Sequence, residues 1–349
     1  MMQTTEIDSA TTITINRILH KIEGNPKGPV LVLFGGIHGN EKAGVQAIES
    51  VLPKLSASKI NGTVYGIAGN IAALQENKRF IKKDLNRQWT KDKIKNLDKI
   101  TDCDEEDLEQ KELFKVLTDV LKSHSGPFYF IDLHTTSSKT IPFITINDAL
   151  INRRFSYLFP VPTVLGIEEY LEGPLLSYIN QLGYVSLGFE SGQHEDGLAV
   201  TNSKAFIYLA LVHTEILKSE DIVNLSNYTN LLKQSAENNI TTYEVTFRHK
   251  IEPNEVFKMC EGYKSFQPID EGIVIAVSNG VSIALKKSST LFMPLYQKAG
   301  EDGYYLIKPI PKLALKLSVF LRKLKFDNLL VMLPGVSWYD KTKEILIVN

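Results

Sequence analysis

Short apolar runs alternate with stretches of helical periodicity between about residues 28 and 217. The first run, PVLVLF (29–34), is continuous, and residues 42–55 follow it with apolar side chains at helical spacing. A continuous run of this kind is typical of a strand buried on both faces, which favours a parallel sheet. We therefore expect βαβ units and a largely parallel sheet that is covered by helices on both faces.

Later apolar runs are predicted to supply further strands of the same sheet. They are residues 62–69, 126–134, 162–167 and 183–190. A stretch with helical spacing, from about Glu105 to Lys122, precedes the second of these runs. The acidic segment from Asp102 to Glu112 overlaps its start, and we expect that segment to be a solvated helix face.

The character of the sequence changes near residue 218. Segment 218–234 is polar and is expected to connect two domains, because short β-rich runs separated by Gly, Pro and Asn follow it. We predict an α/β catalytic domain over residues 1–217 and a smaller, β-rich domain over residues 235–349. A basic amphipathic helix is expected at residues 313–326, packed on the second domain. A chain of 349 residues is long enough for this division.

Composition excludes several kinds of partner. Lys and Arg number 39 against 40 for Asp and Glu, so a net charge of -1 gives no reason to expect nucleic acid or an anionic membrane. The apolar runs are far too short to span a bilayer. The polar N-terminus does not look like a signal peptide, and Cys103 and Cys260 are too few and too far apart for a disulfide framework. We therefore expect a cytoplasmic protein, in which local Arg or Lys attracts any acidic small-molecule substrate.

Three potential metal ligands follow predicted strands directly. His38 and Glu41 come after the strand at 29–34, and His134 ends the strand at 126–134. The carboxyl ends of parallel strands are where open α/β sheets build their sites. Two His and one carboxylate, with a fourth position open for water, form the ligand pattern of a catalytic zinc site. We predict one Zn²⁺ per chain on these residues; the alternative is a surface His followed by a Glu that a helix N-terminus favours.

A carboxylate that acts as a base is also needed, and Glu190 ends the run at 183–190. A carboxylate at the end of a buried strand is costly unless it has a task or a partner. Glu190 is therefore either a general base that later protonates the leaving amine, or a salt-bridged strand end. Asp132 either orients the ring of His134 or caps its strand. His194 lies close enough along the chain to contact a substrate.

Four short motifs occur in order along the chain: GGIHGNE (35–41), RFIKKDLNR (79–87), DLHT (132–135) and FESG (189–192). Together they resemble the succinylglutamate desuccinylase/aspartoacylase family, which is related to the zinc carboxypeptidases. Residues 291–307 also resemble the β-rich C-terminal domain of that family. The resemblance implies a zinc-carboxypeptidase-like, mostly parallel sheet flanked by helices, with a second, smaller β-rich domain.

The resemblance also implies roles for individual residues. It implies His38, Glu41 and His134 as zinc ligands, Glu190 as the catalytic carboxylate, Arg79 as a group that polarises the scissile carbonyl, and Asn86 and Arg87 as binders of a substrate carboxylate. Physical reasoning agrees, since a guanidinium stays charged and binds carboxylates with two parallel hydrogen bonds. One feature departs from the aspartoacylases proper, which have an Arg shortly before the catalytic Glu; here the corresponding stretch contains Asn180 and no Arg.

These observations predict a zinc-dependent amidohydrolase that cleaves the amide bond of a small N-acyl amino acid or a similar acidic amide by metal-activated water. A zinc carboxypeptidase acting on peptides or cell-wall fragments is an alternative, because it would share the metal and the base. A non-catalytic zinc-binding protein is a further alternative. Glu190 and Arg79 argue against it, because a metal store needs neither.

Overall fold

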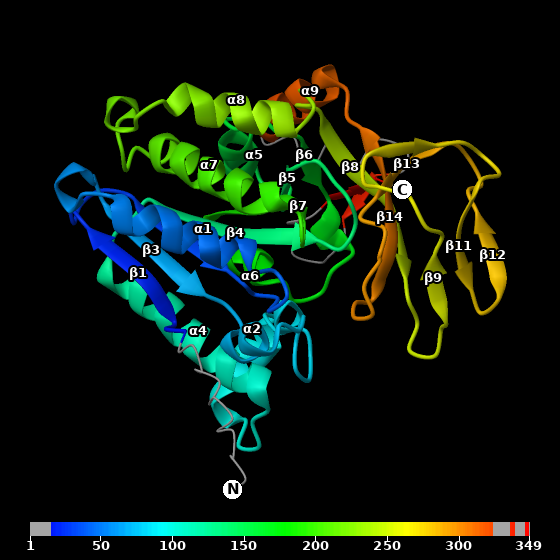
Figure 1. Cartoon of the computed structure of the whole chain (residues 1–349), viewed down its shortest axis with the longest axis horizontal. Helices are drawn as coiled ribbons and strands as arrows, with labels where there is room; N and C mark the ends of the chain where they lie inside the picture. Colours follow the sequence, from blue (N-terminus) through cyan, green and yellow to red (C-terminus); the bar gives the residue numbers. More distant parts are fainter. Residues whose placement is uncertain (1–14, 324–335, 339–345, 349) are drawn as a thin grey trace, which may run out of the picture. The chain divides into compact units, whose positions relative to one another are not determined.

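The computed structural model describes residues 15–323, 336–338 and 346–348. The chain forms two compact units, residues 1–308 and 309–349. The main sheet has eleven strands among the described residues (Figure 1). In spatial order they are β1 (Ile18–Glu23), β3 (Thr63–Ala68), β2 (Val30–Gly35), β4 (Phe128–Thr136), β7 (Val185–Gln193), β5 (Phe143–Ile146), β6 (Thr163–Leu165), β8 (Thr242–Lys250), β14 (Asp302–Pro309), β13 (Ser289–Phe292) and β10 (Gln267–Ile269).

Helices connect the strands of the sheet from β2 to β8, except for β4 and β5, which follow each other directly. The α-helices of the first unit are α1 (Ala43–Val51), α2 (Ile71–Glu76), α3 (Lys91–Asn96), α4 (Glu105–Ser123), α5 (Leu150–Ser156), α6 (Leu175–Gln181), α7 (Gly197–His213) and α8 (Leu225–Ser235). Short 3-10 helices lie at η1 (Leu52–Lys54), η2 (Ala57–Lys59), η3 (Leu85–Arg87), η4 (Leu97–Lys99), η5 (Ile167–Glu169) and η6 (Ser219–Asp221). The predicted alternation of strands and helices is confirmed.

The centre of the sheet is parallel, as the apolar runs predict. Strand β2 pairs in parallel with both β3 and β4, and β4 pairs in parallel with β7. The expectation of a mostly parallel sheet is nevertheless wrong, because the sheet is mixed. Strands β1, β5, β13 and β10 each join a neighbour in antiparallel pairing. Antiparallel strands need only short connections and can leave one face open to water, so their sequences lack the long apolar runs that mark β2 and β4.

The core lies on both faces of the central strands. All residues of β2 are buried, and its side chains alternate between the two faces. Val32 and Phe34 pack in one cluster with Leu113 and Leu117 of α4. On the other face α1 contacts β2 and β4, and α7 contacts both α1 and β7. Figure 1 shows α1 and α7 on the side of the sheet away from α4. This double covering explains why β2 is apolar throughout.

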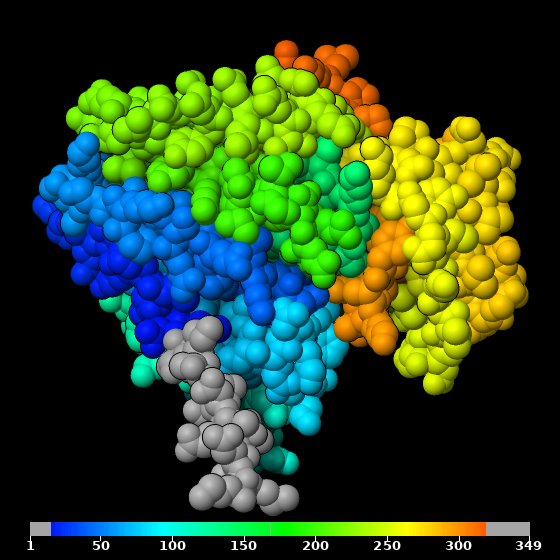
Figure 2. Space-filling view, viewed as in Figure 1, coloured from blue at the N-terminus to red at the C-terminus, as the bar shows by residue number. Residues whose placement is uncertain are grey.

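A small antiparallel sheet lies beside the main one within the first unit. It consists of β9 (Phe257–Met259), β11 (Val274–Ser278) and β12 (Val281–Ala284). Met259 and Ile275 of this sheet share a core cluster with Leu291 and Tyr304 of the main sheet. In Figure 2 these strands lie within the yellow region on the right. The division into domains at residues 217 and 235 stays a prediction.

The second unit contains α9 (Lys312–Lys323) and the antiparallel pair β15 (Val336–Trp338) and β16 (Leu346–Val348). The helix predicted over residues 313–326 is present as far as residue 323, and the rest of the predicted stretch lies outside the described residues. Within the described part of the chain, no helix combines the length and the apolar character that crossing a membrane would require.

Candidate active site

The loop between β2 and α1 carries His38 and Glu41. Gly36 in this loop has a φ of 73°, a left-handed conformation that glycine adopts at little cost. A Cβ atom on Gly39 would lie 2.1 Å from the carbonyl carbon of Ala73, so the loop passes directly against α2. The loop therefore turns sharply after β2 and places His38 and Glu41 at the carboxyl end of the central strands.

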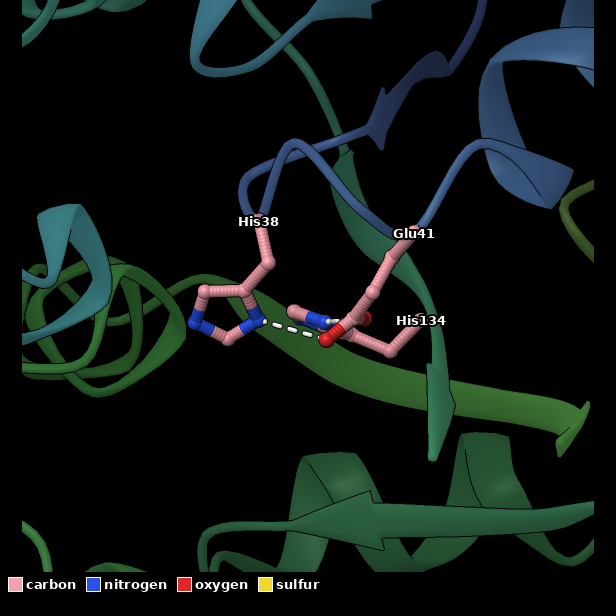
Figure 3. Close-up of side chains that lie close together, drawn as sticks. All are labelled: His38, Glu41 and His134. Atoms are coloured by element: carbon pink, nitrogen blue, oxygen red, sulfur yellow. Dashed lines mark hydrogen bonds and ion pairs between the residues drawn. The ribbon is translucent and has the colours of Figure 1, made fainter. Parts of the chain in front are cut away.

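His134 of β4 meets these two side chains, as Figure 3 shows. Nδ1 of His38 lies 2.9 Å from Oε1 of Glu41, and Nδ1 of His134 lies 2.9 Å from Oε2. The backbone N–H of Thr135 donates to the same Oε2 at 3.0 Å. All three predicted ligands are buried, and one potential ligand atom from each lies within 4.8 Å of the others. A possible His/Glu/His metal site is therefore present.

The second nitrogen of each imidazole faces another carboxylate. Nε2 of His134 lies 2.6 Å from Oδ2 of Asp132, and Nε2 of His38 lies 3.1 Å from Oδ1 of Asp84. Burial alone would lower the pKa of His134, but Asp132 and Glu41 outweigh it and raise that pKa well above its usual value. Of the two alternatives for Asp132, the geometry is that of a residue that orients a ring.

Asp84 is a residue that sequence reasoning missed, although it stands inside the motif RFIKKDLNR. It accepts from Nη2 of Arg79 at 3.0 Å, and Nη1 of Arg79 lies 3.4 Å from Oε1 of Glu41. Burial would raise the pKa of Asp84, but His38 and Arg79 hold it well below its usual range. Nε of Arg79 is buried and has no hydrogen-bond partner among the described residues. Arg79 is thus fixed beside the three potential ligands with one donor free.

Helix α4 holds the loop that carries Arg79. Glu106 in its first turn is fully buried, and its carboxylate accepts from the backbone N–H groups of Ile81 and Lys82 at 2.7 and 2.9 Å. Nδ2 of Asn70 donates to Glu106 at 3.0 Å. The expectation of a solvated acidic face is therefore wrong at Glu106. This carboxylate satisfies backbone donors, which is what makes its burial tolerable.

Glu190 of β7 is the register partner of His134 of β4. Register partners on neighbouring strands point to the same face, so the Glu190 side chain lies on the side of the sheet that carries the His cluster. Glu190 is buried, and its Oε2 has no hydrogen-bond partner among the described residues. Burial raises the pKa of Glu190 to about 8, although the nearby His134 acts in the opposite direction.

Asn86 and Arg87 lie in the same pocket, but the fold already uses some of their polar atoms. Oδ1 of Asn86 accepts from the backbone N–H of Leu175 at 2.9 Å. Nη1 of Arg87 donates to the carbonyl of Asn86 at 3.0 Å, and Nη2 donates to Oδ2 of Asp302 at 3.0 Å. The sequence contained no signal for Asp302, which comes from β14.

A pocket of about 140 Å³ brings all the predicted site residues together. Its wall contains His38, Glu41, Arg79, Asn86, Arg87, His134 and Glu190. Segment 293–305 of the β-rich part supplies Met293, Leu295, Asp302 and Tyr305 to the same wall. His194 also lines the pocket, where its Nδ1 lies 2.8 Å from Oγ1 of Thr135.

Known proteins of one family are similar to this chain. The family model "Succinylglutamate desuccinylase/Aspartoacylase catalytic domain" matches residues 27–205. A probable aspartoacylase of Nostoc sp. is 26% identical over 294 residues, which are 79% of this chain and 92% of that protein. A succinylglutamate desuccinylase of Pseudomonas putida is 39% identical over 67 residues, 19% of this chain and only 20% of that protein.

Solved structures share the fold. The crystal structure of a succinylglutamate desuccinylase/aspartoacylase from Rhodobacter sphaeroides has a TM-score of 0.62 at 16% identity, and the match covers 84% of this chain and 88% of that one. Identity at this level shows the fold alone. The family model spans more than half of the chain, and its region contains the whole His/Glu/His cluster and Glu190. The chain belongs to the succinylglutamate desuccinylase/aspartoacylase family.

Proposed function

We propose that this protein is a zinc-dependent deacylase that hydrolyses the amide bond of a small N-acyl amino acid or a similar acidic amide. The observation that carries the proposal is the convergence of His38, Glu41 and His134 in one pocket with the buried, partly unpartnered carboxylate of Glu190. Membership of the family supports the deacylase class. We also propose that the enzyme is cytoplasmic, which its free cysteines support.

The donor set fits a zinc ion. A carboxylate at Nε2 of each His favours the tautomer with the proton on Nε2, which leaves a lone pair on Nδ1. Both Nδ1 atoms face the carboxylate of Glu41, so a bound cation would replace the protons that otherwise join these nitrogens to the carboxylate. Two imidazoles and one carboxylate are zinc ligands with room for a further ligand. We propose one Zn²⁺ per chain, held by His38, Glu41 and His134.

Zinc, when bound at such a site, lowers the pKa of water and polarises a carbonyl. The chain's own residues would perform the remaining tasks. Glu190 would take a proton from the attacking water on its free Oε2 and give it to the leaving nitrogen, the task of a general acid–base group. The unpartnered Nε of Arg79 would donate to the oxygen on which negative charge develops.

Asn86 and Arg87 are proposed to bind a carboxylate of the substrate. The amide group of Asn86 uses its oxygen to hold Leu175, so its Nδ2 is the atom that would face the substrate. Arg87 would contribute charge as well as hydrogen bonds. The wall from segment 293–305 supports a small substrate, because this segment lines the same pocket as the residues that would hold the metal.

The test is to assay the purified protein, with and without added zinc, on N-acetylated amino acids and on peptides with free carboxyl termini. Release of acetate that a chelator abolishes and zinc restores is the expected result. Cleavage of peptides without deacylation would favour a carboxypeptidase instead. Stoichiometric zinc with no hydrolysis of either class would favour a non-catalytic zinc-binding protein.

A further inference from the structure

Asp302 joins two arginines at the wall of the pocket. Its Oδ2 accepts from Nη2 of Arg87 at 3.0 Å, and its Oδ1 accepts from Nε of Arg248 at 2.5 Å. Arg248 also donates to the backbone carbonyl of Tyr170, which fixes it behind the pocket. The side chains of Arg87, Asp302 and Arg248 are 19%, 18% and 12% exposed. We call these three residues the Asp302 cluster.

The Asp302 cluster limits how much negative charge the pocket can balance. Two guanidinium groups and one carboxylate leave the cluster with a net charge of +1, which matches one carboxylate of a ligand. Among the described residues that line the pocket, Arg79 and Arg87 alone have a permanently positive side chain. Arg79 already lies against the carboxylates of Asp84 and Glu41. Apart from a bound metal, the Asp302 cluster is therefore the part of the site that keeps a surplus of one positive charge, because the charge of Arg79 is already balanced.

The rest of the wall, as far as the described residues form it, offers a second carboxylate no permanently charged partner. Its aliphatic members are Ile146, Ile167, Leu171, Leu176, Met293 and Leu295. Its other polar members near them, such as Asn147 and Ser177, are neutral, and these two hydrogen-bond to each other at 3.2 Å. A carboxylate placed among such side chains would lose its hydration without gaining a cation, which is strongly unfavourable. An uncharged side chain would instead gain from burial against the aliphatic residues.

We propose that Asp302 is a specificity-determining residue that restricts the substrate to a single carboxylate, so that the amino acid released has an uncharged side chain. This inference rests on the proposed deacylase function and names its substrate class. The carboxylate next to the amide would bind at Arg87, and the side chain of the amino acid would lie against the aliphatic part of the wall. If the side chain of the substrate's amino acid carried a second carboxylate, Asp302 would repel it from Arg87.

The first experiment compares matched substrates on the wild-type holoenzyme. N-Acetylglutamate and N-acetylglutamine differ by one charge and have nearly the same shape, and N-acetylmethionine adds an aliphatic side chain. We expect kcat/KM for the glutamine and methionine compounds to exceed that for the glutamate compound by about tenfold or more, the scale of one charge-assisted hydrogen bond. If kcat/KM for N-acetylglutamate and N-acetylaspartate equalled or exceeded that for N-acetylglutamine, the inference would be overturned and the deacylase function would stand. Failure to hydrolyse any N-acyl amino acid would overturn both.

The second experiment tests Asp302 itself. Asp302→Asn keeps the shape of the side chain and leaves two arginines without their shared carboxylate, so the ratio of kcat/KM for N-acetylglutamate over N-acetylglutamine should rise by about tenfold. Because both substrates are measured on one variant, a general loss of activity or stability cancels in the ratio. Asp270→Asn, at an exposed position directly after β10, removes the same charge from a residue that does not line the pocket and should leave the ratio unchanged. An unchanged ratio in Asp302→Asn would overturn the role of Asp302.

Discussion

The carboxylate of Asp84 lies 3.1 Å from Nε2 of His38, while Nδ1 of the same ring faces Glu41. Asp84 also accepts from Arg79, so one carboxylate fixes both a proposed metal ligand and a proposed catalytic arginine. Outer partners of this kind typically contribute about 10- to 100-fold to metal affinity. Asp84 therefore links the β2–α1 loop to the loop that carries Arg79.

Replacing Asp84 with Asn should weaken zinc binding by about 10- to 100-fold, because the amide holds the His38 ring less firmly and no longer favours the required tautomer. Competition with a chromophoric chelator at fixed pH measures this. Asp98→Asn, at an exposed position in η4, is the matched control and should bind zinc like the wild type. Equal affinity in Asp84→Asn and the control would show that Asp84 does not support the metal.

Protein purified without added metal should contain zinc near one equivalent per chain. His38→Ala and His134→Ala should each lose most of it, because two ligands rarely hold zinc tightly. Elemental analysis gives the metal content, and His213→Ala serves as a control, since His213 contacts Phe159 at the far end of α7. Full metal content in both ligand variants would refute the assignment of the site.

Glu190→Gln should keep its zinc but lose about 10²–10⁴-fold in kcat, the usual contribution of a general acid–base group. The amide has nearly the same shape and cannot take a proton from water. Steady-state kinetics and metal content should be measured together, with Glu195→Gln, an exposed neighbour in sequence, as the control. A loss under about threefold would remove Glu190 from the proposed mechanism.

The raised pKa of Glu190 also predicts how stability depends on pH in the metal-free protein. The carboxyl ionises near pH 4.5 in the unfolded chain but near pH 8 when folded, because burial disfavours its charged form. Between these pH values the unfolded chain has lost this proton while the folded protein still holds it. The free energy of unfolding therefore falls as pH rises from about 4.5 and stops falling on account of this group above about pH 8. Urea unfolding should therefore show Glu190→Gln gaining stability over the wild type between pH 5 and pH 8. A constant difference across this range would contradict the burial of an ionisable Glu190.

The central strands and the metal cluster could be predicted from sequence for the same physical reason. Strands buried on both faces are continuously apolar, and the residues that follow them stand out as polar, as His38 does after β2. Strand β1 lacks this signal because most of its residues are only partly buried or exposed, and β5 is a short run of four residues. For that reason the sequence did not indicate that antiparallel strands join the parallel centre of the sheet.

The supporting carboxylates could not be predicted, because their roles depend on partners far away in the chain. Glu106 stands in an acidic stretch that looks like a solvated helix face, yet it is buried under the backbone of Ile81 and Lys82. Asp302 is separated from Arg87 by 215 residues, and only the folding of β14 into the main sheet brings the two together. Sequence patterns report local burial well, but they do not report such long-range pairs.

The two arginines of the pocket should differ in which kinetic constant they control. Arg87 is proposed to bind a carboxylate that is charged throughout the reaction, so Arg87→Ala should mainly raise KM. The free Nε of Arg79 is proposed to face an oxygen that gains charge only as the reaction proceeds, so Arg79→Ala should mainly lower kcat. Charge-assisted bonds contribute roughly 1.5–3 kcal/mol, which sets both effects at about ten- to a hundredfold.

The decisive comparison uses one N-acyl amino acid and its carboxamide analogue on each variant. Wild type should prefer the carboxylate, and Arg87→Ala should lose that preference, because the remaining pair of Arg248 and Asp302 has no net charge. Arg87→Lys keeps the positive charge but cannot form two parallel hydrogen bonds to a carboxylate, so it should recover the preference only partly. Arg154→Ala, at an exposed position on α5, should match the wild type in both constants. If Arg87→Ala kept the full preference for the carboxylate, the substrate carboxylate would have to bind elsewhere in the pocket. The proposal that the Asp302 cluster limits the substrate to one carboxylate would then also be wrong.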